Sequence, residues 1–324
     1  MLLRFAAGLA ALCAGVAAVA VAAVLLERTP GPTPSTAAPS ASSSSPAVTA
    51  PATPTAPPGF PSPPAGSVVY SREDGANVLA LGVVVQTSGV LVQASVVGPD
   101  GTGVRRLHVS FALEGTTMLA TACGAGCYRA TFAPAGRPPA VTVDVRGGAA
   151  TTRWHVVLPS RVPAADASAL LARAGKTWRA LRSLTYAEHL ASDAKHEVTS
   201  TWRVASPDRL AYRIVGGYEA VIIGNRRWDK APGGRWIESP QLPVAQPVPF
   251  WVSFADAHVL GSGTAGGRPV WIVSFFDPAT PGWFEVELEK RTLRTLDLRM
   301  TATAHFMHDA YGAFDQPAGI RPPA

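Results

Sequence analysis

Apolar residues follow several distinct patterns along the chain. An unbroken apolar run covers residues 5–26, and the stretch after it has no apolar period up to Gly66. Short apolar runs separated by turn residues then fill the middle, and a helical period followed by strand alternation fills the last half. These changes of period divide the chain into four segments: 1–28, 29–66, 67–160 and 161–324.

The first run predicts a helix that crosses a membrane. At about 1.5 Å per residue it spans roughly 33 Å, enough for a hydrocarbon core of roughly 30 Å. Arg4 precedes the run, and Glu27 and Arg28 nearly cancel after it, so the positive-inside rule leaves the N-terminus in the cytoplasm. We therefore predict a single-pass signal-anchor in the cell membrane, with the bulk of the chain extracytoplasmic. A cleaved signal peptide is the alternative, although the run exceeds the usual apolar core of such peptides.

Residues 29–66 predict a disordered linker. They are almost wholly Pro, Ala, Ser and Thr, and no charged residue occurs between Arg28 and Arg72. Such a composition cannot bury enough apolar surface to offset the entropy lost on ordering. Its prolines favour an extended, semi-rigid spacer between the membrane and the folded part.

The segment 67–160 predicts an all-β, immunoglobulin-like sandwich. Short apolar runs recur at 78–85, 90–97, 105–113, 127–132, 140–145 and 151–158. Turn residues separate them, and Pro99-Asp100-Gly101 is the clearest of these turns. Evenly spaced short strands without a helical period are typical of a sandwich.

Cys123 and Cys127 frame a short Cys-Gly-Ala-Gly-Cys loop. Outside the membrane the surroundings are oxidising, so we predict a disulfide between them. A redox-active or metal-binding thiol pair is the alternative, but zinc sites of this kind use two such pairs.

The last segment, 161–324, predicts an α+β domain. Residues 166–184 have helical spacing, with Leu170, Ala174, Trp178 and Leu181 on one face. Strand periods follow, and Trp228 and Trp236 bracket an Ala-Pro-Gly-Gly turn across which they could pair. Successive antiparallel strands after one helix indicate a curved sheet wrapped on that helix.

The strand near the end of the chain has the cleanest alternation. Phe284, Val286 and Leu288 occupy one face, and the other carries Glu285, Glu287 and Glu289. We interpret the glutamates as a solvated face and not as a pair of catalytic acids.

The sandwich segment resembles YtkA-like domains, which are immunoglobulin-like modules attached to copper-handling membrane proteins of bacteria. The resemblance covers residues 78–145, and Gly126-Cys127-Tyr128-Arg129-Ala130 carries most of it. No copper ligand of the related sandwich proteins can be carried over to this chain.

Residues 165–323 resemble the LolA-like lipoprotein-carrier fold, a half-barrel closed by a helix. They look like the C-terminal part of copper-transport-type membrane proteins of high-GC bacteria. The matching elements are Val221-Ile222-Ile223-Gly224, Gly233-Gly234-Arg235-Trp236, Ser274-Phe275-Phe276-Asp277-Pro278 and His305-Phe306-Met307. Those larger proteins carry many membrane helices, whereas this chain predicts one, so a transmembrane copper channel is not expected.

Large aromatic side chains of the last segment could line a cavity for a lipid or a lipidated partner. The residues expected there are Trp178, Trp202, Tyr212, Trp228, Trp271 and Phe284. Packing in an ordinary core is the alternative for each of them.

A His-Phe-Met-His cluster holds the most plausible soft-metal ligands. On a strand, His305 and Met307 share a face while His308 points away. Imidazole and thioether suit copper, so His305 and Met307 predict part of a copper site whose third ligand comes from elsewhere. A structural histidine at the end of a sheet is the alternative.

Charge and motifs exclude several function classes. The net charge is +6, but the cations are scattered and form no nucleic-acid stripe. The sequence has no nucleophile elbow, P-loop or metalloprotease motif, and Asp277 before Pro278 predicts an Asx-type turn. We therefore predict a non-enzymatic binding protein without catalytic residues and without a certain cofactor. Copper handling and a structural adaptor role are the alternatives.

Overall fold

The structure of this chain is a computed structural model that describes residues 61–73, 77–133, 138–147, 150–161, 163–193, 195–303 and 305–324. The predicted anchor and most of the predicted linker lie outside these residues. Within the described ranges, no helix has the length and apolar character needed to span a membrane. The chain separates into residues 1–52 and a compact unit from Thr53 to Ala324, and the description below concerns the second.

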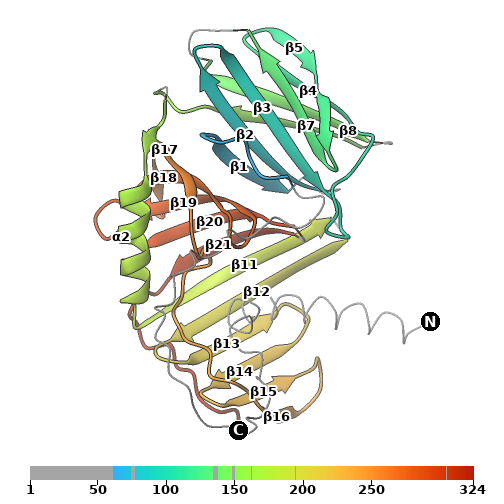
Figure 1. The fold of residues 1–324 in the computed structure, drawn as a ribbon. Helices are drawn as coiled ribbons and strands as arrows, with labels where there is room; N and C mark the ends of the chain where they lie inside the picture. Colours follow the sequence, from blue (N-terminus) through green and yellow to red (C-terminus); the bar gives the residue numbers. More distant parts are fainter. Residues whose placement is uncertain are drawn as a thin grey trace, which may run out of the picture. The chain divides into compact units, whose positions relative to one another are not determined.

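Two antiparallel sheets form first along the chain (Figure 1). One has the order β1-β2-β3-β7-β6, with β1 (Val68–Glu73), β2 (Val78–Gln86), β3 (Gly89–Val97), β7 (Cys127–Phe132) and β6 (Thr121–Gly124). The other has the order β5-β4-β8-β9, with β5 (Thr116–Leu119), β4 (His108–Leu113), β8 (Ala140–Gly147) and β9 (Ala150–Val157). Side chains from both sheets share one apolar core, so the segment forms a sandwich.

The predicted disulfide joins Cys123 of β6 to Cys127 of β7, across the loop between the two strands. Gly126 in this loop has a φ of +68°, a backbone conformation that favours glycine. A Cβ atom at Gly126 would lie 2.3 Å from the carbonyl oxygen of Val96. The loop therefore needs a glycine both for its turn and for its close approach to β3.

The rest of the unit is built on one antiparallel sheet of twelve strands. Its order is β10-β17-β18-β19-β20-β21-β11-β12-β13-β14-β15-β16. The first six are β10 (Ala165–Asp166), β17 (Ala255–Ala265), β18 (Arg268–Asp277), β19 (Gly282–Glu289), β20 (Thr295–Thr301) and β21 (Phe306–Gly312). The others are β11 (Ser183–Asp193), β12 (His196–Ala205), β13 (Arg209–Ile214), β14 (Glu219–Ile223), β15 (Arg226–Lys230) and β16 (Trp236–Pro240). The predicted combination of one helix and an antiparallel sheet is confirmed.

The helix, α2 (Ser168–Arg179), is shorter than the predicted 166–184. The backbone N–H of Leu181 bonds back to the carbonyl of Trp178, and β11 begins at Ser183, so strand pairing takes over the end of the helical pattern. The buried face includes Leu171, Ala174 and Trp178, with Leu171 in place of the predicted Leu170. Leu170 is only half-buried.

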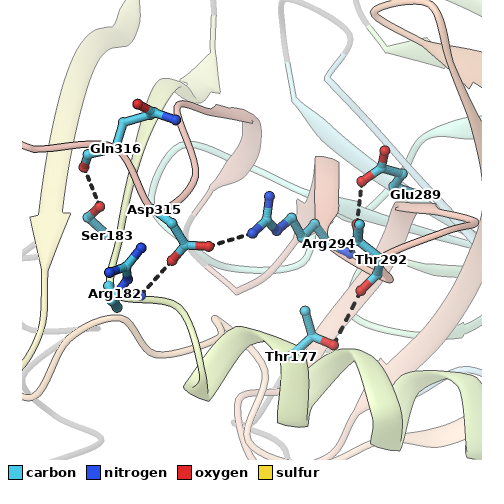
Figure 2. Close-up of polar contacts among 8 residues, drawn as sticks. All are labelled: Thr177, Arg182, Ser183, Glu289, Thr292, Arg294, Asp315 and Gln316. Carbon is cyan, nitrogen blue, oxygen red and sulfur yellow. Dashed lines mark hydrogen bonds and ion pairs between the residues drawn. The ribbon is translucent and has the colours of Figure 1, made fainter.

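A network of polar contacts holds the C-terminal end of α2 (Figure 2). The Thr177 hydroxyl donates to the carbonyl of Thr292, in the turn between β19 and β20, at 3.4 Å. The Arg182 N–H donates to Asp315 Oδ1 at 2.8 Å, and Asp315 also forms an ion pair with Arg294. The helix is thus fixed to a β-turn, to the start of β11 and to the segment after β21.

The twelve-stranded sheet has two different faces. The register between β18 and β19 pairs Phe275 with Phe284 and Phe276 with Trp283, and side chains alternate between faces along a strand. We call the face of Phe275 and Phe284 the helix-side face, because α2 covers it through Trp178. We call the face of Phe276 and Trp283 the sandwich-side face.

The sandwich packs on the sandwich-side face through β1 and β2. One apolar cluster joins the two, and its members are Val69, Val78, Ala80, Val97, Phe276, Trp283 and Phe306. The Ser71 hydroxyl donates to the Trp283 carbonyl at 2.5 Å and accepts from the Thr301 N–H at 3.1 Å. These buried hydrogen bonds fix β1 over β19 and β20, beside which it lies in Figure 1.

This packing corrects the interpretation of the glutamates in β19. Glu285 forms an ion pair with Arg299 at 3.3 Å, and Glu289 is only 6% exposed. Burial raises the pKa of both Glu285 and Glu287 above the ordinary range. The predicted solvated face is wrong because strand alternation does not reveal that the sandwich covers the polar side.

Candidate functional site: an aromatic face and a neighbouring pocket

Ten aromatic rings form a continuous cluster on the helix-side face, and we call this the aromatic cluster. Its members are Trp178, Tyr186, Trp202, Tyr212, Phe250, Trp251, Phe254, Phe275, Phe284 and Tyr311. They come from α2, from six strands and from the segment between β16 and β17. Parts of the chain that are far apart in sequence therefore build one apolar surface.

The rings meet in geometries that are favourable for aromatic pairs. Trp178 of α2 touches Tyr311 edge to face, with ring centroids 5.0 Å apart. Phe275 and Phe284 stack at 4.9 Å, and Trp251 meets the edge of Phe275 at 5.6 Å. The helix, the sheet and the segment before β17 thus share one layer of rings.

Residues 241–254 cover this face, and we call them the covering segment. They form no strand and contain no charged residue. The Asp277 carboxylate holds one end, because it accepts from the N–H of Val252 at 2.7 Å and from the Ser253 hydroxyl at 2.6 Å. Asp277 also accepts from the N–H of Ala279 at 2.8 Å, as the predicted Asx-type turn requires.

The covering segment is apolar on both sides. Two of its own side chains, Val244 and Trp251, are buried, at 9% and 5% exposure. On its outer side Leu242 and Val252 are exposed by about two thirds, at 65% and 64%, and Val248 by 47%. With Ile237 of β16, these are four of the seven large hydrophobic side chains exposed among the described residues. Exposed apolar side chains that recur along one short segment suit contact with a membrane or a partner.

The cluster also contains two buried acids, Glu188 of β11 and Asp309 of β21, which lie opposite each other across paired strands. Burial raises the pKa of Glu188, and burial together with the charge of Glu188 raises the pKa of Asp309 well above its usual range. Neither acid stands out in the sequence. Each is one polar residue in an alternating strand, and only the register brings them together.

The predicted cavity residues divide between the two faces. Trp178, Trp202, Tyr212 and Phe284 belong to the aromatic cluster. Trp228 lies on the other face, against Ala211, Val221 and Ile320. Trp271 lies under the Lys290 ammonium, which is 4.0 Å from the ring centroid.

The predicted pairing of Trp228 with Trp236 is wrong in register. Trp228 lies opposite Glu238, and Trp236 lies opposite Lys230. The indole N–H of Trp228 donates to Glu238 at 3.2 Å, and the Lys230 ammonium lies 5.6 Å from the Trp236 ring centroid. The two rings are therefore diagonal neighbours in one cluster.

A pocket of about 960 Å³ lies on the opposite side of the sheet, between the sandwich and the sandwich-side face. Tyr70, Trp154 and Phe306 contribute to its apolar wall, and Arg72, Glu73, Glu285 and Arg299 to its charged wall. No local sequence pattern predicts this pocket, because its walls come from β1, β9 and β17 as well as from the polar side of β19 and β20.

The proposed copper ligands occupy different settings. His305 precedes β21, and burial lowers its pKa to about 4. Met307 is buried on the helix-side face, opposite Met300 and Leu190. His308 points to the other face, where its Nε2 is 2.7 Å from Asp297. Among the described residues no group of three His, Cys, Asp or Glu could hold a metal. The copper site stays a prediction.

The comparisons with known proteins give only distant likenesses. No family model matches the sequence, and no curated protein sequence matches it. Solved structures that are similar include LprF from Mycobacterium bovis, at 11% identity and a TM-score of 0.38, covering 52% of this chain and 99% of LprF. The Mycobacterium tuberculosis lipoprotein LppX is similar at 8% identity and a TM-score of 0.38, over 47% of this chain and 97% of LppX.

A putative outer membrane lipoprotein-sorting protein domain from Vibrio parahaemolyticus is similar at 10% identity and a TM-score of 0.23, over 47% of this chain and 93% of that domain. Likenesses of this size assign neither a family nor a ligand to the chain, so its own residues must carry any functional argument.

Proposed function

We propose that the chain is an extracytoplasmic binding protein, tethered to the cell membrane, that holds an apolar ligand between the helix-side face and the covering segment. The ligand is a lipid or the acyl chain of a lipidated partner. The aromatic cluster under an uncharged, strandless segment is the observation that carries this proposal.

Ligand sites are typically apolar and aromatic with a few polar groups, as this face is. A segment without ladder hydrogen bonds opens at lower free energy than a strand does. Displacing the covering segment would free the rings of Phe250, Trp251 and Phe254 from the sheet and leave space for an acyl chain. Leu242, Val248 and Val252 would let the same segment touch a membrane from which a lipid is taken.

Photo-crosslinking in living cells tests the proposal on the full chain. Cells expressing the chain are fed a fatty acid that bears a diazirine, which enters their lipids, and the chain is then irradiated and digested. We expect lipid adducts on peptides that contain Trp251, Phe275 or Phe284. Adducts confined to the apolar run 5–26 would contradict the proposal.

A matched pair of variants adds a control. Trp251→Ala removes a ring of the aromatic cluster and should reduce these adducts several-fold, whereas Trp154→Ala removes a ring of the pocket on the other face and should leave them unchanged. Adducts that respond to Trp154→Ala and not to Trp251→Ala would place the ligand in the pocket instead.

A further inference from the structure

Two carboxyl groups occupy the centre of the aromatic cluster without a cation. Glu188 is 4% exposed and Asp309 is fully buried. The residues next to them in sequence, His189 and His308, point to the sandwich-side face, where they bind Glu73 and Asp297 at 2.7 Å. The described residues therefore provide no basic partner for either acid on the helix-side face.

Neutral donors satisfy only part of this pair. Glu188 Oε2 accepts from the Ser200 hydroxyl at 2.6 Å and from the Trp202 indole N–H at 2.8 Å. Asp309 Oδ2 accepts from the Tyr311 hydroxyl at 2.6 Å. Asp309 Oδ1 is buried without a partner among the described residues.

A second buried group nearby also lacks a partner. The indole N–H of Trp178 has none among the described residues, although Trp178 is only 3% exposed. Trp178 touches the ring of Tyr311, whose hydroxyl binds Asp309. Buried polar groups are almost always hydrogen-bonded. Asp309 Oδ1 and the Trp178 N–H are therefore two unusual groups, and both belong to residues that contact Tyr311.

The surroundings also favour an uncharged ligand group at this position. Burial raises the pKa of both acids and so shifts each of them towards its protonated, neutral form. An anionic head group would meet two acids and no cation. An uncharged group with both a donor and an acceptor would complete the hydrogen bonds without placing a charge among the rings.

Building on the proposed function, we propose that Asp309 and Trp178, supported by Glu188, form a polar subsite within the apolar-ligand face. This subsite binds an uncharged ligand group that both donates and accepts hydrogen bonds, such as a hydroxyl or a secondary amide. The ligand class is then an apolar molecule with a neutral polar group, and not a free fatty acid.

A pair of probes that differ by one hydrogen-bond donor tests the subsite on the full chain in its membrane. One is a 1,2-diacylglycerol with a diazirine in an acyl chain, and the other is its 3-O-methyl ether, which lacks the O–H. We expect the diacylglycerol to label peptides of the helix-side face at about tenfold lower concentration than the ether, as one lost buried hydrogen bond implies.

Two variants test the two hydrogen bonds separately. Asp309→Leu removes the open oxygen, so it should weaken diacylglycerol labelling about tenfold and abolish the preference over the ether, which has no O–H to donate. Trp178→Phe replaces the indole by a benzene ring and removes its N–H, so it should weaken labelling by both probes, because the oxygen of either probe can accept from that N–H. Trp228→Phe makes the same ring change on the opposite face and should behave as the wild type. Melting temperatures of all variants show which of them fold.

The outcomes separate the two proposals. Labelling of the helix-side face by both probes at equal concentration, or a preference that survives Asp309→Leu, would overturn the subsite and leave the proposed function standing. No labelling of that face by either probe would overturn both.

Discussion

The two faces of the twelve-stranded sheet are both buried, but in different ways. On the sandwich-side face, Glu285 pairs with Arg299 and Asp297 pairs with His308. On the helix-side face, Glu188 and Asp309 have only hydroxyl and indole donors. The face of Glu285 and Asp297 meets the sandwich, whose edge strand β1 is hydrogen-bonded to it.

The two interfaces also differ in how the covering part of the chain is attached. The sandwich is held by buried hydrogen bonds from β1 to β18, β19 and β20. The covering segment is held at one end by a bond from the Gln241 N–H to the Asn225 carbonyl and at the other end by Asp277. A bond from the Gln246 N–H to the Pro207 carbonyl holds its interior, and the segment forms no strand ladder.

The largest expected effect compares two adjacent, fully buried residues of β19. Trp283→Ala and Phe284→Ala should each lower the free energy of unfolding by about 3–5 kcal/mol, because each leaves a cavity. Denaturant unfolding measures this loss. Phe284→Ala should also reduce lipid adducts on the helix-side face, whereas Trp283→Ala should not. If both variants reduced adducts equally, the two faces would not be independent.

A smaller effect is expected at the fixed interface. Ser71→Ala should cost about 1–3 kcal/mol of unfolding free energy, since it leaves the Trp283 carbonyl and the Thr301 N–H buried without their partner. Ser88→Ala, at an exposed turn, is the control and should change stability by less than about 0.5 kcal/mol. Equal stability of the two variants would show that this interface is loose.

Sequence patterns predicted the strands better than the site. The bounds of β7 match the prediction, because Gly126 and the residues after Phe132 mark both ends. Strand β1 was not predicted, because its apolar run is short and follows a segment rich in proline. The alternation of polar and apolar residues correctly placed Glu285 and Phe284 on opposite faces of the sheet. A period of two cannot show which part of the chain covers each face.

The acid pair was beyond any local pattern. Glu188 and Asp309 lie in strands whose register is set by long-range pairing, so no spacing in the sequence joins them. The covering segment was missed for a related reason, since a charge-free stretch with several prolines gives no periodic signal. Four of the six residues predicted to line a cavity belong to the aromatic cluster, because large aromatics favour the buried face in either case. Their role in lining a cavity stays a prediction.

The titration of the helix-side acids gives the next prediction. A carboxyl whose pKa is raised by folding keeps its proton at pH values where the unfolded chain has lost it. The resulting loss of unfolding free energy is absent below the ordinary carboxyl pKa of about 4, and it grows as the pH rises towards the raised pKa. Asp309→Asn cannot ionise, so it should gain stability relative to the wild type between pH 4 and pH 7.

The slope of this gain is at most about 1.4 kcal/mol per pH unit for one group. The groups that raise the pKa of Asp309 are its buried surroundings, Glu188 and Asp297, while the Tyr311 hydroxyl acts against them. Denaturant unfolding at several pH values measures the difference. Asp144→Asn is the control, because Asp144 pairs with Arg153 in the sandwich and its removal should not stabilise the chain at pH 7. A gain of stability by Asp309→Asn that does not change with pH would contradict the burial of this acid.

The smallest effect on stability is expected at the outer side of the covering segment. Changing Leu242, Val248 and Val252 together to serine alters exposed side chains, so the free energy of unfolding should change by less than about 0.5 kcal/mol per site. The same change should reduce lipid adducts on the helix-side face several-fold, because the segment loses the apolar surface with which it meets a membrane. Serine at Leu119 and Val157, equally exposed on the sandwich, is the matched control and should leave the adducts unchanged. Equal adducts in both variants would mean that the ligand reaches the aromatic cluster without contact between the covering segment and the lipid.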